Sequence, residues 1–265
     1  MTTETNAQEH ALHLPPSSLW PLIMSVGIGF IPFGVIFLGW GSKIVAELLF
    51  ICGSSITLVS LMGWAQSVIR DKSHPGERSL VMTENDLVMF LKYFLISEAA
   101  IFAALFVHYY YHRYQMPFWP PAGSPEMETH LPALATLLLM FSSLTCEMGH
   151  RAFKHGSRFR AKTLTVATIV LGLVFLGMQG YEWGVLHGQH GFTTSTNIFG
   201  TMFYMMTGFH GLHVATGVVM LALVYGRMEM GHMTEKRHFA LLAASWYWHF
   251  VDVIWIGLFF SLYLI

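Results

Sequence analysis

Seven long apolar stretches, separated by shorter polar ones, make up most of the chain. Each stretch is long enough to cross the roughly 30 Å hydrocarbon core of a bilayer as a helix. A helix also satisfies its own backbone hydrogen bonds in that environment. The pattern therefore predicts an all-α membrane protein with seven transmembrane helices. The predicted spans are Leu19–Trp40, Ile44–Ile69, Leu87–Tyr111, His130–Phe153, Thr163–Leu186, Asn197–Gly226 and Phe239–Ile265.

The polar stretches divide the chain into parts of different character. Residues 1–18 form a polar tail without Lys or Arg, which is not typical of a signal peptide. Residues 73–86 mix both charge signs and are predicted to link a two-helix part, 19–72, to a five-helix bundle, 87–265. The first span is the least regular because Pro32 and several glycines interrupt it, although membrane helices tolerate both residue types.

The composition supports a membrane protein and argues against other classes. The chain has 265 residues, of which 54% are hydrophobic and only 11% charged, whereas soluble domains carry about 25% charged residues. A net charge of -1 gives no indication of nucleic-acid binding. The two cysteines, Cys52 and Cys146, lie inside apolar segments and form neither a metal-binding spacing nor a disulfide framework.

The basic residues predict the orientation. With seven spans, the N-terminus shares one side of the membrane with the second, fourth and sixth connections, and eleven of the 14 Lys and Arg residues lie there. They are Arg70, Lys72, Arg78, Arg151, Lys154, Arg158, Arg160, Lys162, Arg227, Lys236 and Arg237. The opposite side carries only Lys43 and Arg113. The positive-inside rule then predicts a cytoplasmic N-terminus and a periplasmic C-terminus in a bacterial inner membrane.

Two histidines lie near the middle of the sixth span. His210 and His213 are three residues apart and project from nearly the same helix face. Titratable groups at that depth are expected to face protein rather than lipid. Thr207, Gly211 and Ala215 form a row of small residues at helical spacing, which predicts close approach of another helix.

Glu98, near the middle of the third span, is the most conspicuous single residue. An ionised carboxylate there costs several kcal/mol unless it is paired. One interpretation is a carboxylate that handles protons or contacts lipid headgroups. The other is a protonated Glu98 that bonds to a neighbouring helix and only holds the bundle together.

His249 and Asp252 lie on one face of the seventh span. Asp252 could fix the tautomer of a histidine or balance its charge, and the pair could equally be a polar cluster that locks helix packing. Haem ligation by His210, His213 and His249 is a further alternative. We disfavour it, since His210 and His213 are too close to serve haems at two depths, and we expect no metal in this chain.

Charged residues near the helix ends suggest lipid contacts or simple anchoring. Glu182 lies near the outer end of the fifth span, beside polar Gln179 and Trp183. Arg70, Asp71 and Arg227 lie at cytoplasmic helix ends, where basic side chains often meet lipid phosphates. Snorkelling side chains that only set helix depth are the alternative.

Several motifs together resemble subunit III of haem-copper cytochrome c oxidase. They are Thr207–Val214 (TGFHGLHV), Trp246–Trp255 (WYWHFVDVIW), Leu95–Glu98 (LISE) and the Trp119–Pro121 turn, and they stand at the family's relative spacing. The end of the fourth helix, Thr145–His150, departs from the family because it lacks the usual Trp-Ala-His-His pattern.

The resemblance implies a fold and a set of partners. It implies two helices and five helices separated by a V-shaped cleft that holds phospholipid. It implies no haem or copper in this chain, those groups being in partner subunits. The family's subunit III packs against subunit I, in a complex with subunit II and small subunits that accepts electrons from a cytochrome c-type donor. A respiratory supercomplex is possible within the family.

The resemblance also implies roles for particular residues. Subunit III supports proton uptake by subunit I and protects it from inactivation during turnover. Glu98 corresponds to the family's buried carboxylate, and Arg70, Asp71, His213 and Arg227 correspond to positions that contact cleft lipid. His210, His249, Asp252 and Glu182 are predicted to form polar contacts that hold the helices together.

Three alternative functions remain at this stage. Quinol oxidases and nitric-oxide-reductase gene clusters contain homologues of subunit III, which usually have five spans, so the two additional N-terminal spans favour the cytochrome c type. A membrane haem protein is the second alternative. A proton-coupled transporter using Glu98 and the histidines is the third. Such transporters are commonly built from inverted repeats with broken helices at matching positions. The sequence shows no such pairing, and an odd number of spans fits it poorly.

Overall fold

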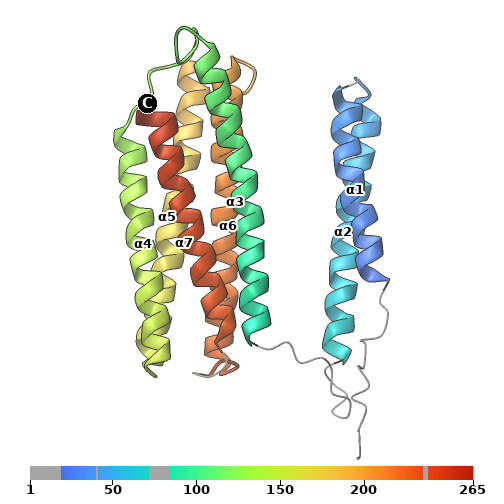
Figure 1. Cartoon of the computed structure of the whole chain (residues 1–265), viewed down its shortest axis with the longest axis vertical. Coiled ribbons are helices and arrows are strands. Elements are labelled where there is room, and N and C mark those ends of the chain that lie inside the picture. The colour runs from blue at the N-terminus through green and yellow to red at the C-terminus, as the bar shows by residue number, and fades with distance from the viewer. Residues whose placement is uncertain (1–18, 40, 72–83, 235–237, 265) are drawn as a thin grey trace, which may run out of the picture. The chain divides into compact units, whose positions relative to one another are not determined.

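Helices form all of the regular structure described by the computed structural model, which covers residues 19–39, 41–71, 84–234 and 238–264 (Figure 1). The helices are α1 (Trp20–Gly39), α2 (Lys43–Asp71), α3 (Glu84–Gln115), α4 (His130–Lys154), α5 (Arg158–His190), α6 (Ile198–Glu229) and α7 (Phe239–Phe259), and a π-helical turn, η1 (Phe260–Leu264), continues α7. No β-strand occurs among the described residues. The predicted all-α fold with seven helices is confirmed.

Six of the helices, α2 to α7, are long and apolar enough to cross a membrane. In α1 the described stretch Trp20–Gly34 is apolar as well. The helix itself continues unbroken through Pro32 to Gly39. The prediction of a polytopic membrane protein is therefore confirmed.

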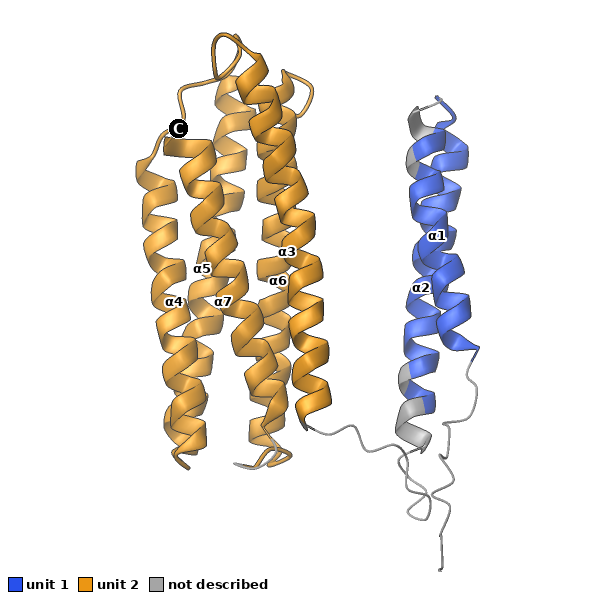
Figure 2. Ribbon diagram, in the orientation of Figure 1, with its two compact units in different colours: residues 1–82 blue, residues 83–265 orange. Residues whose placement is uncertain are grey.

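The chain divides into two compact units, residues 1–82 and 83–265 (Figure 2). The boundary falls inside the predicted linker 73–86, of which residues 73–83 lie outside the described part. In the first unit, α1 packs against α2 through two glycines. A Cβ atom on Gly53 would lie 2.8 Å from the carbonyl oxygen of Gly27, so only glycine permits this approach of the two backbones.

The second unit is an up-and-down bundle of five helices (Figure 1). The α3–α4 and α5–α6 connections and the end of α7 lie at one end of this bundle, and the α4–α5 turn and the α6–α7 connection lie at the other. The end with the α4–α5 turn and the α6–α7 connection is called the basic end here, because it carries Arg151, Lys154, Arg158, Lys162 and Arg227. There Lys162 of α5 forms an ion pair with Glu229 of α6, with 2.9 Å between Nζ and Oε2.

Local sequence explains where several of these helices begin and end. The Asn197 side chain accepts a hydrogen bond from the Gly200 amide at 2.9 Å and caps the start of α6. Gly191 ends α5 with a left-handed φ of 59°, and Gly156 turns the chain between α4 and α5 with a φ of 78°.

Trp248 of α7 lies at the centre of the bundle. A Cβ atom on Gly172 of α5 would lie 2.5 Å from its ring, and one on Gly217 of α6 would lie 2.8 Å from it. Its Nε1 donates a hydrogen bond to Ser142 Oγ of α4 at 2.9 Å. One side chain of α7 therefore contacts three other helices.

Trp255, seven residues further along α7, repeats this arrangement. Its Nε1 donates to Thr136 Oγ1 of α4 at 2.9 Å. Its ring packs edge-on to Phe175 of α5 at 4.7 Å and stacks on His210 of α6 at 5.0 Å between ring centroids. The two tryptophans make α7 the element against which α4, α5 and α6 assemble.

The predicted close approach at Gly211 is wrong for the described residues. A Cβ atom added to Gly211 would meet nothing within 4 Å. The tight contacts lie instead at Gly172 and Gly217, which face Trp248. Gly211 thus lies on a face of α6 that no other described helix of the second unit covers closely.

Candidate functional site

Glu98 and His213 form a pair between α3 and α6. His213 Nε2 lies 3.0 Å from Glu98 Oε2, and both residues fall near the middle of their helices. The Glu98 side chain is 19% exposed and the His213 side chain is 11% exposed. The two sequence motifs LISE and TGFHGLHV therefore meet in one polar contact at membrane depth, and both interpretations of Glu98 stay predictions.

The geometry determines how many protons this pair holds. His213 Nδ1 lies 2.8 Å from the carbonyl oxygen of Phe209. A carbonyl oxygen only accepts, so Nδ1 carries a hydrogen. The contact between Nε2 and Glu98 then requires one further proton, on the carboxyl group or on the ring. The pair is electrically neutral overall in both arrangements.

The same geometry argues against one predicted role of His213. Both of its ring nitrogens are already bonded within the protein, to Phe209 and Glu98. A headgroup contact of His213 would have to replace one of these two bonds, and it stays a prediction. Phe102 packs edge-on to the ring at 5.0 Å, and Tyr247 donates a hydrogen bond to the His213 carbonyl at 3.2 Å.

His210 lies in a different environment although it is one turn away. Its side chain is fully buried, between the rings of Trp255 and Phe175. Neither ring nitrogen has a hydrogen-bond partner among the described residues. His210 therefore contacts its neighbours through its ring face and edge, and its packing role stays a prediction.

We expect replacement of His210 by leucine to stabilise the five-helix unit. An unpaired buried polar group costs about 1–3 kcal/mol, and an apolar group of similar size removes that cost. We therefore expect the free energy of unfolding in mixed micelles to rise by about 1 kcal/mol. A fall of that size would show instead that the imidazole nitrogens have partners that stabilise the fold.

His249 and Asp252 point to the interface between α7 and α4. His249 Nε2 lies 3.8 Å from Glu147 Oε2 of α4. Asp252 is buried, with Ser143 of α4 as its neighbour. His249 thus faces Glu147 on the other helix, and whether the cluster locks packing stays a prediction.

The three histidines of the haem alternative, His210, His213 and His249, face different neighbours in the structure. His210 faces the core, His213 faces Glu98, and His249 faces Glu147. Across the described part of the chain, no three His, Cys, Asp or Glu side chains are grouped so that they could hold a metal ion.

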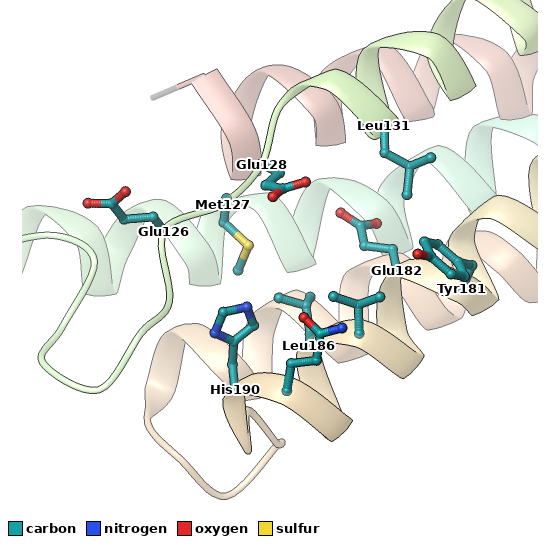
Figure 3. Close-up of a pocket in the computed structure, with 10 residues that line it drawn as sticks. Glu126, Met127, Glu128, Leu131, Tyr181, Glu182, Leu186 and His190 are labelled. Carbon is teal, nitrogen blue, oxygen red and sulfur yellow. The ribbon is translucent and has the colours of Figure 1, made fainter.

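Glu182 connects α5 to the end of α7. Its Oε2 accepts hydrogen bonds from Tyr263 Oη at 2.8 Å and from Gln179 Nε2 at 3.0 Å. The residue also lines a cavity of about 200 Å³, together with Glu128 and His190 (Figure 3). This cavity lies at the end of the bundle opposite the basic end.

The remaining predicted lipid contacts are described only in part. Arg227 is exposed in the last turn of α6, at the basic end. Arg70 and Asp71 fall in the last turn of α2, and their side chains lie outside the described residues.

Sequence reasoning missed Glu147 as a site residue. It binds Arg151 Nε at 2.6 Å and faces both His150 and His249. A signal was present, because Ser143, Glu147 and His150 follow one another at helical spacing on one face of an apolar helix.

Fold and polar contacts together define a polytopic all-α membrane protein whose buried polar residues lie mainly between helices. A family model for cytochrome c oxidase subunit III matches residues 10–265. The chain belongs to that family, and the resemblance inferred from its motifs is confirmed.

Individual relatives agree with this assignment. Cytochrome c oxidase subunit 3 of Marchantia polymorpha is 35% identical over 269 residues, which cover 97% of each chain. The same subunit of Rattus norvegicus is 32% identical over 264 residues, again 97% of each chain. That of Synechocystis sp. is 40% identical over 193 residues, or 72% of this chain and 81% of the relative.

Proposed function

We propose that this chain is the non-catalytic subunit III of a proton-pumping haem-copper cytochrome c oxidase. The complex reduces dioxygen to water with haem and copper held in partner subunits, and no catalytic centre lies in this chain. The observation that carries the proposal is the family match over residues 10–265. The subunit is proposed to stabilise subunit I and to support proton uptake there.

Charge and contacts support an orientation and a lipid role. The basic end of the five-helix unit carries Arg151, Lys154 and Arg227, and the positive-inside rule favours the cytoplasmic side for it. With two further spans before this unit, we propose a cytoplasmic N-terminus and a bacterial inner membrane as the location. We also propose that Arg70 and Arg227 bind phospholipid headgroups at this side, where lipid phosphates concentrate.

Removal of the subunit tests the stabilising role. We expect the oxidase without this chain to keep most of its initial rate of oxygen reduction and to lose activity sooner during turnover. Changing Arg70 and Arg227 to alanine together should shorten the working lifetime in the same direction. Oxygen consumption followed to complete inactivation measures both quantities.

One outcome would contradict the stabilising role. Loss of the initial rate with an unchanged lifetime would show that the chain is needed for chemistry rather than for stability. Lys162→Ala is a matched control, because it removes a basic residue that is already paired with Glu229 at the same end. Supplying reduced cytochrome c or a quinol to the purified complex separates the cytochrome c oxidase from the quinol oxidase alternative.

A further inference from the structure

A stripe of polar side chains runs along the interface between α4 and α7. Residues three, four and seven positions apart share one helix face, and polar residues recur at these spacings on both helices. The stripe begins at the basic end of the bundle and reaches towards the middle of α7. Its members are Ser143, Glu147 and His150 on α4, and His238, Ser245, His249 and Asp252 on α7 and its N-cap.

Most of the unpaired buried polar atoms of the described residues lie in this stripe. They are Ser143 Oγ, His150 Nε2, His238 Nδ1, Ser245 Oγ and Asp252 Oδ1. Ser143 lies beside Asp252 and Ser245 lies beside the Cys146 thiol, but neither contact has the geometry of a hydrogen bond. Ser245 is fully buried, and Asp252 is only 8% exposed. Each unpaired group costs about 1–3 kcal/mol. In proteins such groups are usually satisfied by internal water, which makes about three hydrogen bonds.

The facing groups of the stripe are not joined by direct hydrogen bonds. The rings of His150 and His238 lie 5.8 Å apart between centroids. Glu147 Oε2 and His249 Nε2 are 3.8 Å apart, beyond direct hydrogen-bonding distance. The Glu147 and His249 side chains are 34% and 37% exposed, so the stripe reaches the surface of this chain where these two meet.

We propose that this polar stripe binds a short chain of water molecules, through which the Asp252 carboxyl group exchanges its proton with water at the basic end. An ionised carboxylate at this depth would need a cation. His249 lies close enough to Asp252 to act on it electrostatically, but it also faces Glu147, and Arg151 is bonded to Glu147. Since the full positive charge of Arg151 is taken up by Glu147, Asp252 is proposed as the neutral acid, hydrogen-bonded to water.

Other titratable groups near α7 lie in separate contacts. Glu98 of α3 and His213 of α6 bond to each other. His210 of α6 packs against Trp255. Lys154 of α4 is close enough to His150 to influence it electrostatically. The route to Asp252 is thus bounded by Glu147, His150 and His249, and the site is independent of the Glu98–His213 pair.

Hydrogen–deuterium exchange in the intact membrane complex tests the proposal. Infrared spectroscopy should show a protonated carboxyl band that disappears in Asp252→Asn and that shifts promptly when water is replaced by D₂O. Ser245→Val removes one hydrogen-bonding group from the water chain, and we expect it to slow the shift about tenfold, the equivalent of one hydrogen bond. Thr165→Val is the matched control, since this buried hydroxyl bonds within α5 to the Ala161 carbonyl, and it should leave the shift unchanged.

Two results would overturn the proposal. One is a carboxyl spectrum that is identical in the wild type and Asp252→Asn, which would make Asp252 an ionised residue. The other is an exchange rate that Ser245→Val leaves unchanged. A high-resolution map of the unaltered complex gives an independent test if the Asp252 variant does not assemble. Density for water beside Ser143, Ser245 and Asp252 supports the proposal, and direct pairing of these side chains without water contradicts it.

Discussion

Replacement of Trp248 by alanine is expected to lower the free energy of unfolding of the five-helix unit by about 3 kcal/mol. Trp248 is 1% exposed, fits against Gly172 and Gly217, and donates a hydrogen bond to Ser142. Comparable substitutions in soluble cores cost about 3–5 kcal/mol. We expect the lower value because lipid tails are as apolar as the core, so lost packing contacts dominate the cost. Chemical unfolding of the full chain in mixed micelles measures the change.

Two further variants test whether the loss of stability comes from the packing of Trp248 or would follow from removing any aromatic ring. Phe159→Ala removes the aromatic ring of a residue that is 81% exposed. We expect it to lower the free energy of unfolding by less than about 0.5 kcal/mol. Trp248→Phe keeps part of the ring volume and loses the bond to Ser142, so its cost should be intermediate. Equal costs for Trp248→Ala and Phe159→Ala would show that α7 is not held by Trp248.

The helices themselves were predictable because the bilayer requires them. An apolar run of sufficient length has almost no other way to satisfy its backbone in lipid, and the predicted starts of α4 and α7, His130 and Phe239, agree with the structure. The ends of α5 were less predictable, because charged residues such as Arg158 and Arg160 continue the helix beyond its apolar part.

The partners of the polar residues could not be predicted in the same way. In a soluble helix the apolar stripe indicates which face is inside, whereas in lipid both faces of a helix are apolar. The rotation of α3 and α6 was therefore undetermined, and Glu98 and His213 are 115 residues apart in sequence. Their family motifs indicated importance for both residues but gave no contact between them.

The Glu98–His213 pair is expected to tolerate Glu98→Gln and not Glu98→Ala. Charge separation in the middle of a membrane is costly, so we place the shared proton on the Glu98 carboxyl group, which donates to His213 Nε2. A glutamine amide can donate the same hydrogen bond. We expect the free energy of unfolding of Glu98→Gln to lie within about 0.5–1 kcal/mol of the wild-type value, and the variant to assemble with intact oxygen reduction. Glu98→Ala should lower the free energy of unfolding by about 2 kcal/mol, because it leaves His213 Nε2 unpaired.

The comparison of these variants locates the proton. If the pair were a carboxylate and an imidazolium, glutamine could not replace the charge, and Glu98→Gln would be as damaging as Glu98→Ala. A double-mutant cycle with His213→Phe gives the coupling directly, and we expect about 1–2 kcal/mol between the two positions. A cycle between Glu98 and Tyr263 is the control. Tyr263 lies in η1, at the C-terminal end of α7, where it is bonded to Glu182, so it should be uncoupled from Glu98.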